Sequence, residues 1–260
     1  MNDRASAISS LTAHVVAAID AAPGFDAPFS HIQFQNLFPA DVYAEILRCM
    51  PNAADYRPLP GRGNVNQKAD GSFTRVKIDL FPEFIRHLPA EKRGVWDIVG
   101  TSLCSGAVQA AFVRRLAAGM ERRFGARYAD VGMYAIPVLT RDVPDYRITP
   151  HTDTHWKGIT VQIYLPPDSS HAEIGTIFHG RAEDGKLTHD KRMPFVPNSG
   201  YAFAVNDISW HSADPVPHTV DTRDSILLTY FVDAGLLRFL RNRAKRAGNL
   251  VGNELRQLVR

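Results

Sequence analysis

The sequence predicts an α+β protein with a mainly β core, on three observations. Residues 1–127 carry mostly helical patterning, in which apolar residues recur every three or four positions. Residues 128–235 instead contain short runs of β-branched and aromatic residues bounded by turn residues, as strands do. Residues 236–260 are rich in basic side chains and predict a final helix. Because 260 residues suit one large domain, we expect these three parts to form a single domain.

The N-terminal part is expected to support the strand-rich core. Apolar residues from Ser6 to Ala21 form one helical stripe, which is predicted to end at Pro23-Gly24. Residues 29–38 are typical of a strand, and a helix is predicted from Pro39 to Met50. These elements would bring a strand and two helices against the core.

A polar stretch then separates these elements from the next helices. Glycine and asparagine residues within 61–71 predict loops. The basic side chains of the stretch would be solvated, as such runs usually are, or would belong to a lid. They are Arg62, Lys68, Arg75 and Lys77. Residues 96–124 then predict two helices, separated near Ser105-Gly106.

The core segment contains the runs that predict strands. Each run is rich in β-branched or aromatic residues, and turn residues such as Asn198 and Gly200 stand between them. The runs are residues 131–138, 146–149, 159–165, 201–205 and 226–231. Short strands joined by turns favour antiparallel sheets, in which residues far apart in the sequence become neighbours.

Composition excludes several classes of protein. Apolar residues make up 45% and charged residues 22%, which is ordinary for a globular protein, and the net charge of +3 is too small to imply a nucleic-acid partner. Cys49 and Cys104 have no metal-type spacing and make no disulfide framework. No apolar run approaches the ~18 residues of a membrane-spanning helix, and the N-terminus lacks the order of a signal peptide. We therefore expect a cytoplasmic protein with reduced thiols.

The residues that carry chemistry are His151-Thr-Asp153 and the later His211. Two imidazoles and one carboxylate can occupy one face of an octahedral iron(II), which leaves three positions open. On a strand, Asp153 would point the same way as His151 because it follows two residues later. His211 can join them only if the chain folds back as an antiparallel sheet. A lone His-x-Asp is a weak signal, but here predicted strands flank it on both sides.

Arg223-Asp-Ser225 opens the last predicted strand, and its order after His211 completes a pattern. This pattern resembles the non-haem iron(II)/2-oxoglutarate-dependent dioxygenases. The resemblance implies a double-stranded β-helix (jelly-roll) core with N-terminal helical support. It also implies that His151, Asp153 and His211 bind Fe(II), and that Arg223 pairs with the distal carboxylate of 2-oxoglutarate.

The resemblance extends, with less weight, to three further side chains of the co-substrate pocket. Ser225 would lie beside Arg223 on the same strand face. Tyr164 stands before Leu165-Pro166, where prolyl-hydroxylase-like members place a tyrosine that bonds the same carboxylate. Tyr134 is a weaker candidate for the same pocket. Gln162 faces the same way as Tyr164 by strand parity, although the equivalent place in the family is often apolar.

The resemblance implies an oxygenase that uses Fe(II), 2-oxoglutarate and O2 and releases succinate and CO2. We expect it to hydroxylate a small polar metabolite or biosynthetic intermediate. Asp153 favours hydroxylation, because related halogenases have Gly or Ala at that position. Two alternatives stay open: a peptidyl (prolyl-type) hydroxylase, and a cupin-like binding protein or isomerase without redox chemistry, which would not need Arg223. Nucleic-acid demethylation is disfavoured, since no second arginine and no aromatic-plus-basic platform is visible.

A few other residues have two interpretations each. Arg147, by parity with His151, could clamp a substrate carboxylate or pair with Asp145. Trp156 and Lys157 could form a lip for the substrate or simply pack. The basic helix at 236–260 would be a solvated face, or less often a contact with an anionic membrane or a phosphorylated substrate. The oligomeric state is left open by the sequence.

Overall fold

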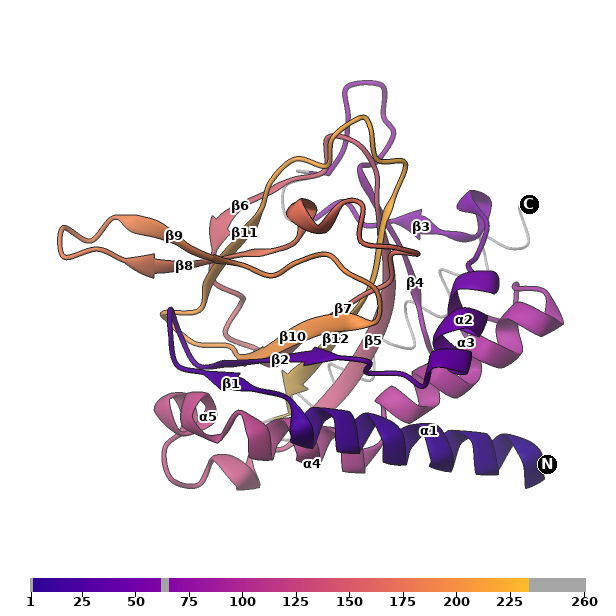
Figure 1. Ribbon diagram of the computed structural model, residues 1–260, viewed down its shortest axis with the longest axis horizontal. Coiled ribbons are helices and arrows are strands. Elements are labelled where there is room, and N and C mark those ends of the chain that lie inside the picture. Colours follow the sequence, from indigo (N-terminus) through magenta and orange to yellow (C-terminus); the bar gives the residue numbers. More distant parts are fainter. Residues whose placement is uncertain (1, 62–65, 234–260) are drawn as a thin grey trace.

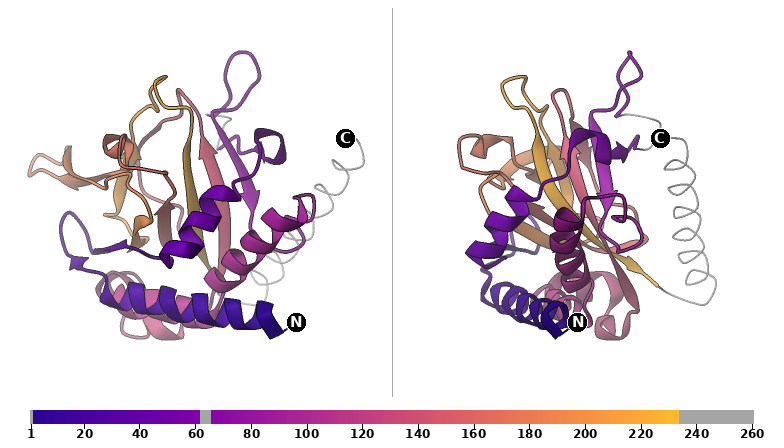
Figure 2. Two further views of the ribbon diagram at one scale, coloured as in Figure 1. Left: turned by 45° about the vertical axis from the view of Figure 1, so that its right-hand side comes forward. Right: turned by 90° about the vertical axis from the view of Figure 1, so that its right-hand side faces the viewer.

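Two antiparallel sheets face each other, and helices cover the outer face of the larger one (Figure 1). This computed structural model describes residues 2–61 and 66–233. The basic helix predicted at 236–260 and Arg62 of the polar stretch therefore lie outside the described residues. Figure 2 shows the same layers from two further directions, with the indigo and magenta helices on one side of the strands.

The larger sheet has eight strands in the order β1-β2-β10-β7-β12-β5-β4-β3, and the smaller has four in the order β6-β11-β8-β9. The strands of the larger sheet are β1 (Gly24–Phe25), β2 (His31–Gln35), β3 (Arg57–Pro58), β4 (Arg75–Asp79), β5 (Met133–Asp142), β7 (Lys157–Tyr164), β10 (Ser199–Ala204) and β12 (Arg223–Val232). Those of the smaller sheet are β6 (Ile148–His151), β8 (Ile177–Arg181), β9 (Leu187–Arg192) and β11 (Trp210–Ala213). The core is thus the double-stranded arrangement that the sequence predicts.

The helices are α1 (Asn2–Ala21), α2 (Ala40–Arg48), α3 (Ala90–Leu103), α4 (Gly106–Arg115) and α5 (Ala117–Phe124). Short 3₁₀ turns occupy Ala53–Asp55, Tyr128–Asp130 and Ala172–Ile174. The sequence predicts two helices within 96–124, but this stretch belongs to three helices, because the chain breaks again at Leu116. The break near Ser105 is as predicted, since the Ser105 side chain accepts a hydrogen bond from the Val108 N–H and so caps α4.

Alternation along the strands separates the two faces of the larger sheet. Along β12, Ile226, Leu228 and Tyr230 are buried in the apolar core beneath the helices. The α1 stripe, which includes Leu11 and Val15, belongs to the same core. The intervening β12 residues point to the other side, toward the smaller sheet. The larger sheet therefore has one apolar face for the helices and one face for a site.

A second apolar cluster fills part of the space between the two sheets. It contains mostly aromatic side chains, including Phe29, Phe178 and Phe203. Phe178 packs edge-on against Phe203, with ring centroids 5.7 Å apart. This cluster holds the sheets together at one end and leaves polar side chains facing each other beside it. Among the described residues, no helix is both long and apolar enough to cross a membrane.

Candidate metal centre and anion pocket

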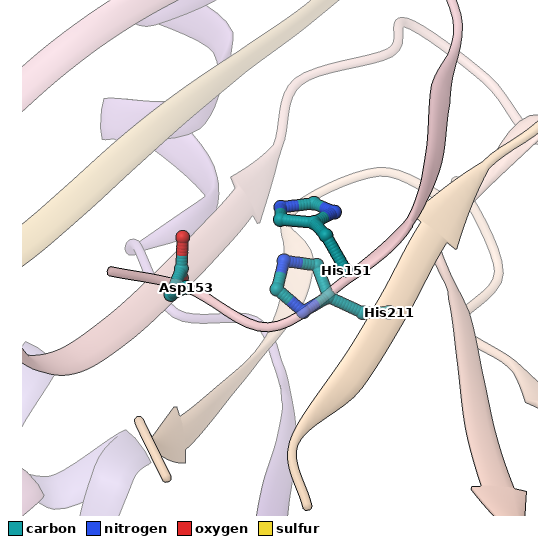
Figure 3. Close-up of side chains that lie close together, drawn as sticks. All are labelled: His151, Asp153 and His211. Atoms are coloured by element: carbon teal, nitrogen blue, oxygen red, sulfur yellow. The ribbon is translucent and has the colours of Figure 1, made fainter. Parts of the chain in front are cut away.

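His151, Asp153 and His211 come together at the edge of the smaller sheet (Figure 3). His151 ends β6 and lies directly opposite His211 of β11 in the antiparallel register. Asp153 lies in the loop that follows β6, so it reaches the site through a turn and not through the strand parity predicted from the sequence. One ligand atom of each residue lies within 4.8 Å of the other two. The three side chains are therefore close enough to hold one metal ion.

The backbone orients both imidazoles in the same way. His151 Nδ1 lies 3.0 Å from the Thr149 carbonyl oxygen, and His211 Nδ1 lies 3.0 Å from that of Ser209. Because a carbonyl only accepts, each Nδ1 carries the hydrogen and donates it. Each Nε2 then keeps its lone pair, which is the tautomer that a metal ligand needs. Burial lowers the pKa of His211 to about 4, so its ring is neutral at neutral pH.

The Asp153 carboxylate is ionised and held at both oxygens. Lys157 Nζ donates to Oδ1 and the Thr160 hydroxyl to Oδ2, each at 2.6 Å. Burial alone would raise the pKa of Asp153, but the charge of Lys157 and these hydrogen bonds outweigh it and hold the pKa well below its usual range. Two imidazoles that direct Nε2 to the site and a fixed carboxylate fit the donor set of a non-haem iron(II) centre.

A bulge in β6 decides which neighbours join this site. His211 pairs with His151, whereas Ala213 pairs with Ile148, so the β6 strand carries one extra residue. The extra residue breaks the parity on which the prediction for Arg147 depended. Arg147 is exposed, and Tyr146 lines the cavity in its place. The parity argument for Arg147 is therefore wrong, and Arg147 does not line this cavity.

One cavity between the two sheets is lined both by the cluster of His151, Asp153 and His211 and by Arg223. The Arg223 guanidinium is buried, and Nε and Nη2 donate to Asp142 Oδ2 at 3.1 and 2.9 Å. Nη1 donates to the Ile174 carbonyl at 2.6 Å. Within the described residues these bonds use three of the five N–H groups of the guanidinium. Two N–H groups are left for a ligand in the cavity.

Arg75 lines the same cavity, and the sequence interpretation missed it. The stretch 75–79 is strand β4 and not a loop, and Arg75 donates to both oxygens of Asp142. Its guanidinium carbon lies 4.0 Å from the Tyr146 ring centroid. The alternation of charged and apolar residues from Arg75 to Asp79 was the available signal. Lys77 is also paired, with Asp79 at 2.9 Å, so neither basic residue is simply solvated.

Of the remaining predicted side chains, Tyr164 lines the pocket and Ser225 belongs to the wall behind it. Tyr164 lines the cavity, but its hydroxyl already donates to Thr176 Oγ1 at 3.0 Å and accepts from the Thr176 N–H. Burial raises the pKa of Tyr164, which keeps the phenol neutral. Ser225 faces the inside, where its hydroxyl contacts Thr140 at 2.9 Å and also Gln162. These groups hold the pocket walls together.

Tyr134 does not reach the pocket. It lies at the other end of β5, where it pairs with Phe231 in the register and stacks on its ring at 5.6 Å. Arg223 pairs instead with Asp142, which is about 26 Å away along the strand at ~3.3 Å per residue. The prediction for Tyr134 is therefore wrong. Its strand parity is the right one for the inner face, but its position along the strand is not.

The two residues with open interpretations after the metal motif have different environments. Trp156 is 49% exposed on the loop beyond Asp153. Lys157 is part of the cavity wall and pairs with Asp153. Lys157 therefore acts within the candidate metal centre, and Trp156 is left as a surface side chain beside it.

Comparison with solved structures finds the same fold in two hydroxylases. A Trichoplax adhaerens prolyl hydroxylase, solved with a peptide fragment of hypoxia inducible factor, has a TM-score of 0.52 at 13% identity; the match covers 90% of this chain and 94% of that one. A Pseudomonas putida prolyl-4-hydroxylase has a TM-score of 0.51 at 15% identity, covering 85% of this chain and 100% of that one. No family model and no curated protein matches the sequence. The predicted fold class is confirmed, and these identities support nothing finer.

Proposed function

We propose that this chain is an Fe(II)- and 2-oxoglutarate-dependent oxygenase that hydroxylates a small polar metabolite or biosynthetic intermediate, with release of succinate and CO2. One observation carries the proposal. The cluster of His151, Asp153 and His211 and the guanidinium of Arg223 line one cavity between the sheets. A metal-type site and a carboxylate-binding group in one cavity are what a chelating oxo-dicarboxylic acid requires.

The roles of the residues follow from their environments. The Nε2 atoms of His151 and His211 and the carboxylate of Asp153 would hold the metal. Iron(II) held in this way would supply the redox chemistry with O2 and the oxo acid. The two remaining N–H groups of Arg223 would bind the distal carboxylate of 2-oxoglutarate. The aromatic cluster between the sheets would limit access of water to that end of the cavity.

Tyr164 and Ser225 would act on this pocket through their neighbours. Tyr164 holds Thr176, and Thr176 is also bonded by the Tyr201 hydroxyl at 2.9 Å. Ser225 joins β12 to β5 through Thr140. Both residues would fix the wall against which Arg223 lies, and neither is needed as a direct ligand.

The proposal is tested by succinate release. The purified protein with Fe(II), 2-oxoglutarate and O2 is screened against free amino acids, other polar metabolites and proline-containing peptides. A small molecule that stimulates succinate formation and gains one oxygen supports the proposal, and a response to peptides alone assigns a peptidyl hydroxylase. Binding of the metal without any consumption of 2-oxoglutarate would favour the cupin-like alternative.

A further inference from the structure

The buried Arg223 and the half-buried Arg75 share one carboxylate at the inner end of the cavity. Arg75, Asp142 and Arg223 lie in one row across β4, β5 and β12, since Asp142 is the register partner of both arginines. Arg75 donates from Nε and Nη2 to the two carboxylate oxygens, at 2.5 and 2.8 Å. Arg223 donates twice to Oδ2 alone. Asp142 is fully buried between them.

This row carries an unbalanced positive charge. Both guanidiniums are permanently ionised, and the two of them hold the carboxyl pKa of Asp142 below its ordinary value although burial opposes this. No other carboxylate of the described residues is hydrogen-bonded to Arg75 or Arg223. The remaining charges of the cavity wall, Lys157 and Asp153, pair with each other. A buried excess charge is unfavourable unless a partner of opposite sign completes it.

We propose that Arg75 is a positioning residue that gives the pocket its selectivity for a dicarboxylic 2-oxo acid. Because Arg75 pairs with both oxygens of Asp142 while Arg223 pairs with Oδ2, this single negative charge is shared by two positive charges and neutralises only one of them. The distal carboxylate of the ligand then balances the one positive charge that remains in the row. This inference rests on the proposed function, because it assumes that the ligand of Arg223 is the co-substrate.

The competing explanation is that Arg75 is only a bridge between strands. The chain offers a matched control for that explanation. Arg141 makes an equivalent pair with Asp224 between β5 and β12, with Nε 2.8 Å from Oδ1 and Nη2 3.3 Å from Oδ2. Its guanidinium also lies over a tyrosine, with the carbon 4.5 Å from the Tyr56 ring centroid. Arg141 belongs to the opposite face of the sheet and not to the cavity wall.

The experiment measures binding by calorimetry on the Mn(II)-loaded protein, which avoids turnover. The ligands are 2-oxoglutarate and 2-oxopentanoate, which has a methyl group in place of the distal carboxylate. The variants are Arg75→Gln, Asp142→Asn, their combination, and Arg141→Gln as control. Loss of one nearby charge is expected to change the affinity for 2-oxoglutarate by about tenfold or more.

The expected changes have opposite signs. Arg75→Gln weakens 2-oxoglutarate binding, Asp142→Asn strengthens it, and the combination restores the wild-type net charge and with it most of the affinity. Binding of 2-oxopentanoate stays the same in all of them, and Arg141→Gln changes neither ligand. If Arg75 were only a bridge between strands, Arg75→Gln would weaken the binding of both ligands together. The combined variant would then bind 2-oxoglutarate no more tightly than Arg75→Gln does.

Other outcomes overturn the proposal in distinguishable ways. Unchanged 2-oxoglutarate affinity in Arg75→Gln, with normal binding by the wild type, rejects the role of Arg75 alone. A wild type that binds no 2-oxoglutarate rejects the proposed function and this inference together. If Arg75→Gln does not fold, Asp142→Asn decides, because tighter binding of the dicarboxylate alone supports the charge argument and weaker or unchanged binding rejects it.

Discussion

At the two candidate metal histidines, backbone carbonyls accept the Nδ1 hydrogen and so orient the ring, as carboxylate side chains often do at metal sites. Thr149 and Ser209 each present a carbonyl to the Nδ1 hydrogen of the histidine two residues later. The same local geometry at both residues leaves both Nε2 atoms free. A metal ion held at this site would therefore depend on each histidine separately.

Replacing His211 by Ala is expected to remove the weak visible charge-transfer band that Fe(II) and 2-oxoglutarate give together without oxygen. The reason is that two ligands alone cannot hold the metal and the chelate in the same geometry. His179→Ala is the control, because His179 is a histidine of the adjacent β8 strand that bonds Ser212 at 2.7 Å and lies outside the cavity wall. An unchanged band in His211→Ala would contradict the assignment.

Arg223→Leu is expected to weaken 2-oxoglutarate binding by roughly 2–5 kcal/mol, the usual cost of removing one partner of a buried charge pair. Metal binding should largely survive, because Arg223 hydrogen-bonds Asp142 and Ile174 and none of the three metal-type residues. Separate titrations of metal and co-substrate check this. Equal affinity for 2-oxoglutarate in both proteins would mean that another cation holds the acid.

At the scale of elements, helix α5 holds the loop that carries Asp153. Arg123 near the end of α5 donates to the carbonyl oxygens of His155 in that loop and of Lys157 at the start of β7, and to that of Val205 at 2.6 Å. Val205 directly follows β10. One side chain thus ties a helix, the metal loop and a strand of the larger sheet, so the position of Asp153 depends on an element far from it in the sequence.

Arg123→Met is expected to weaken metal binding by about 10–100-fold, as loss of partners behind metal ligands does. The fold should persist, since the packing of α5 and the sheet is untouched. The matched control is Arg122→Met, because Arg122 is 52% exposed and only approaches Asp207 at 3.5 Å. Mn(II) titration with a thermal melt of each variant makes the comparison. Similar metal affinities in the two variants would show that the loop holds its shape without Arg123.

At the scale of the whole molecule, the buried aromatic cluster between the sheets contains an imidazole at its edge. His31 is 1% exposed and packs edge-on against Phe178 at 4.9 Å, and its Nδ1 lies 2.8 Å from the Phe29 carbonyl. Burial lowers the pKa of His31 to about 4, and the charge of Lys191 adds to this while Asp26 opposes it. The folded protein therefore keeps this ring neutral.

Stability is expected to fall as the pH decreases from about 6.5 toward 4, in part because of His31. In that window the unfolded chain binds a proton at this histidine, whereas the folded chain does not, so protonation favours unfolding. Below the folded pKa both states are protonated and this contribution stops changing. Thermal melts over the pH range should show a shallower slope in His31→Gln than in wild type. The exposed His189→Gln serves as control, and parallel slopes in all three proteins would exclude His31 as the source.

Much of the architecture follows from local patterns. The helical stripe of α1, the strands β5, β7, β10 and β12 and the order of the metal-type residues are all legible in the sequence, because periodicity and residue type act over a few neighbours. The strand β4 was missed because its charged residues lie on the inner face. A pattern of alternating charge has the same appearance whether those charges meet solvent or a buried partner.

The sequence by itself therefore determined the class of fold, the alternation of the strands and the three residues of the candidate metal centre. Only the tertiary structure decided the composition of the anion pocket. Arg75 meets Asp142 because β4 pairs with β5, and a bulge in β6 admits Tyr146 in place of Arg147. Tyr134 lies outside the pocket because of its register. Pairing, register and bulges are set by contacts between distant segments, and local residue preferences carry no record of them.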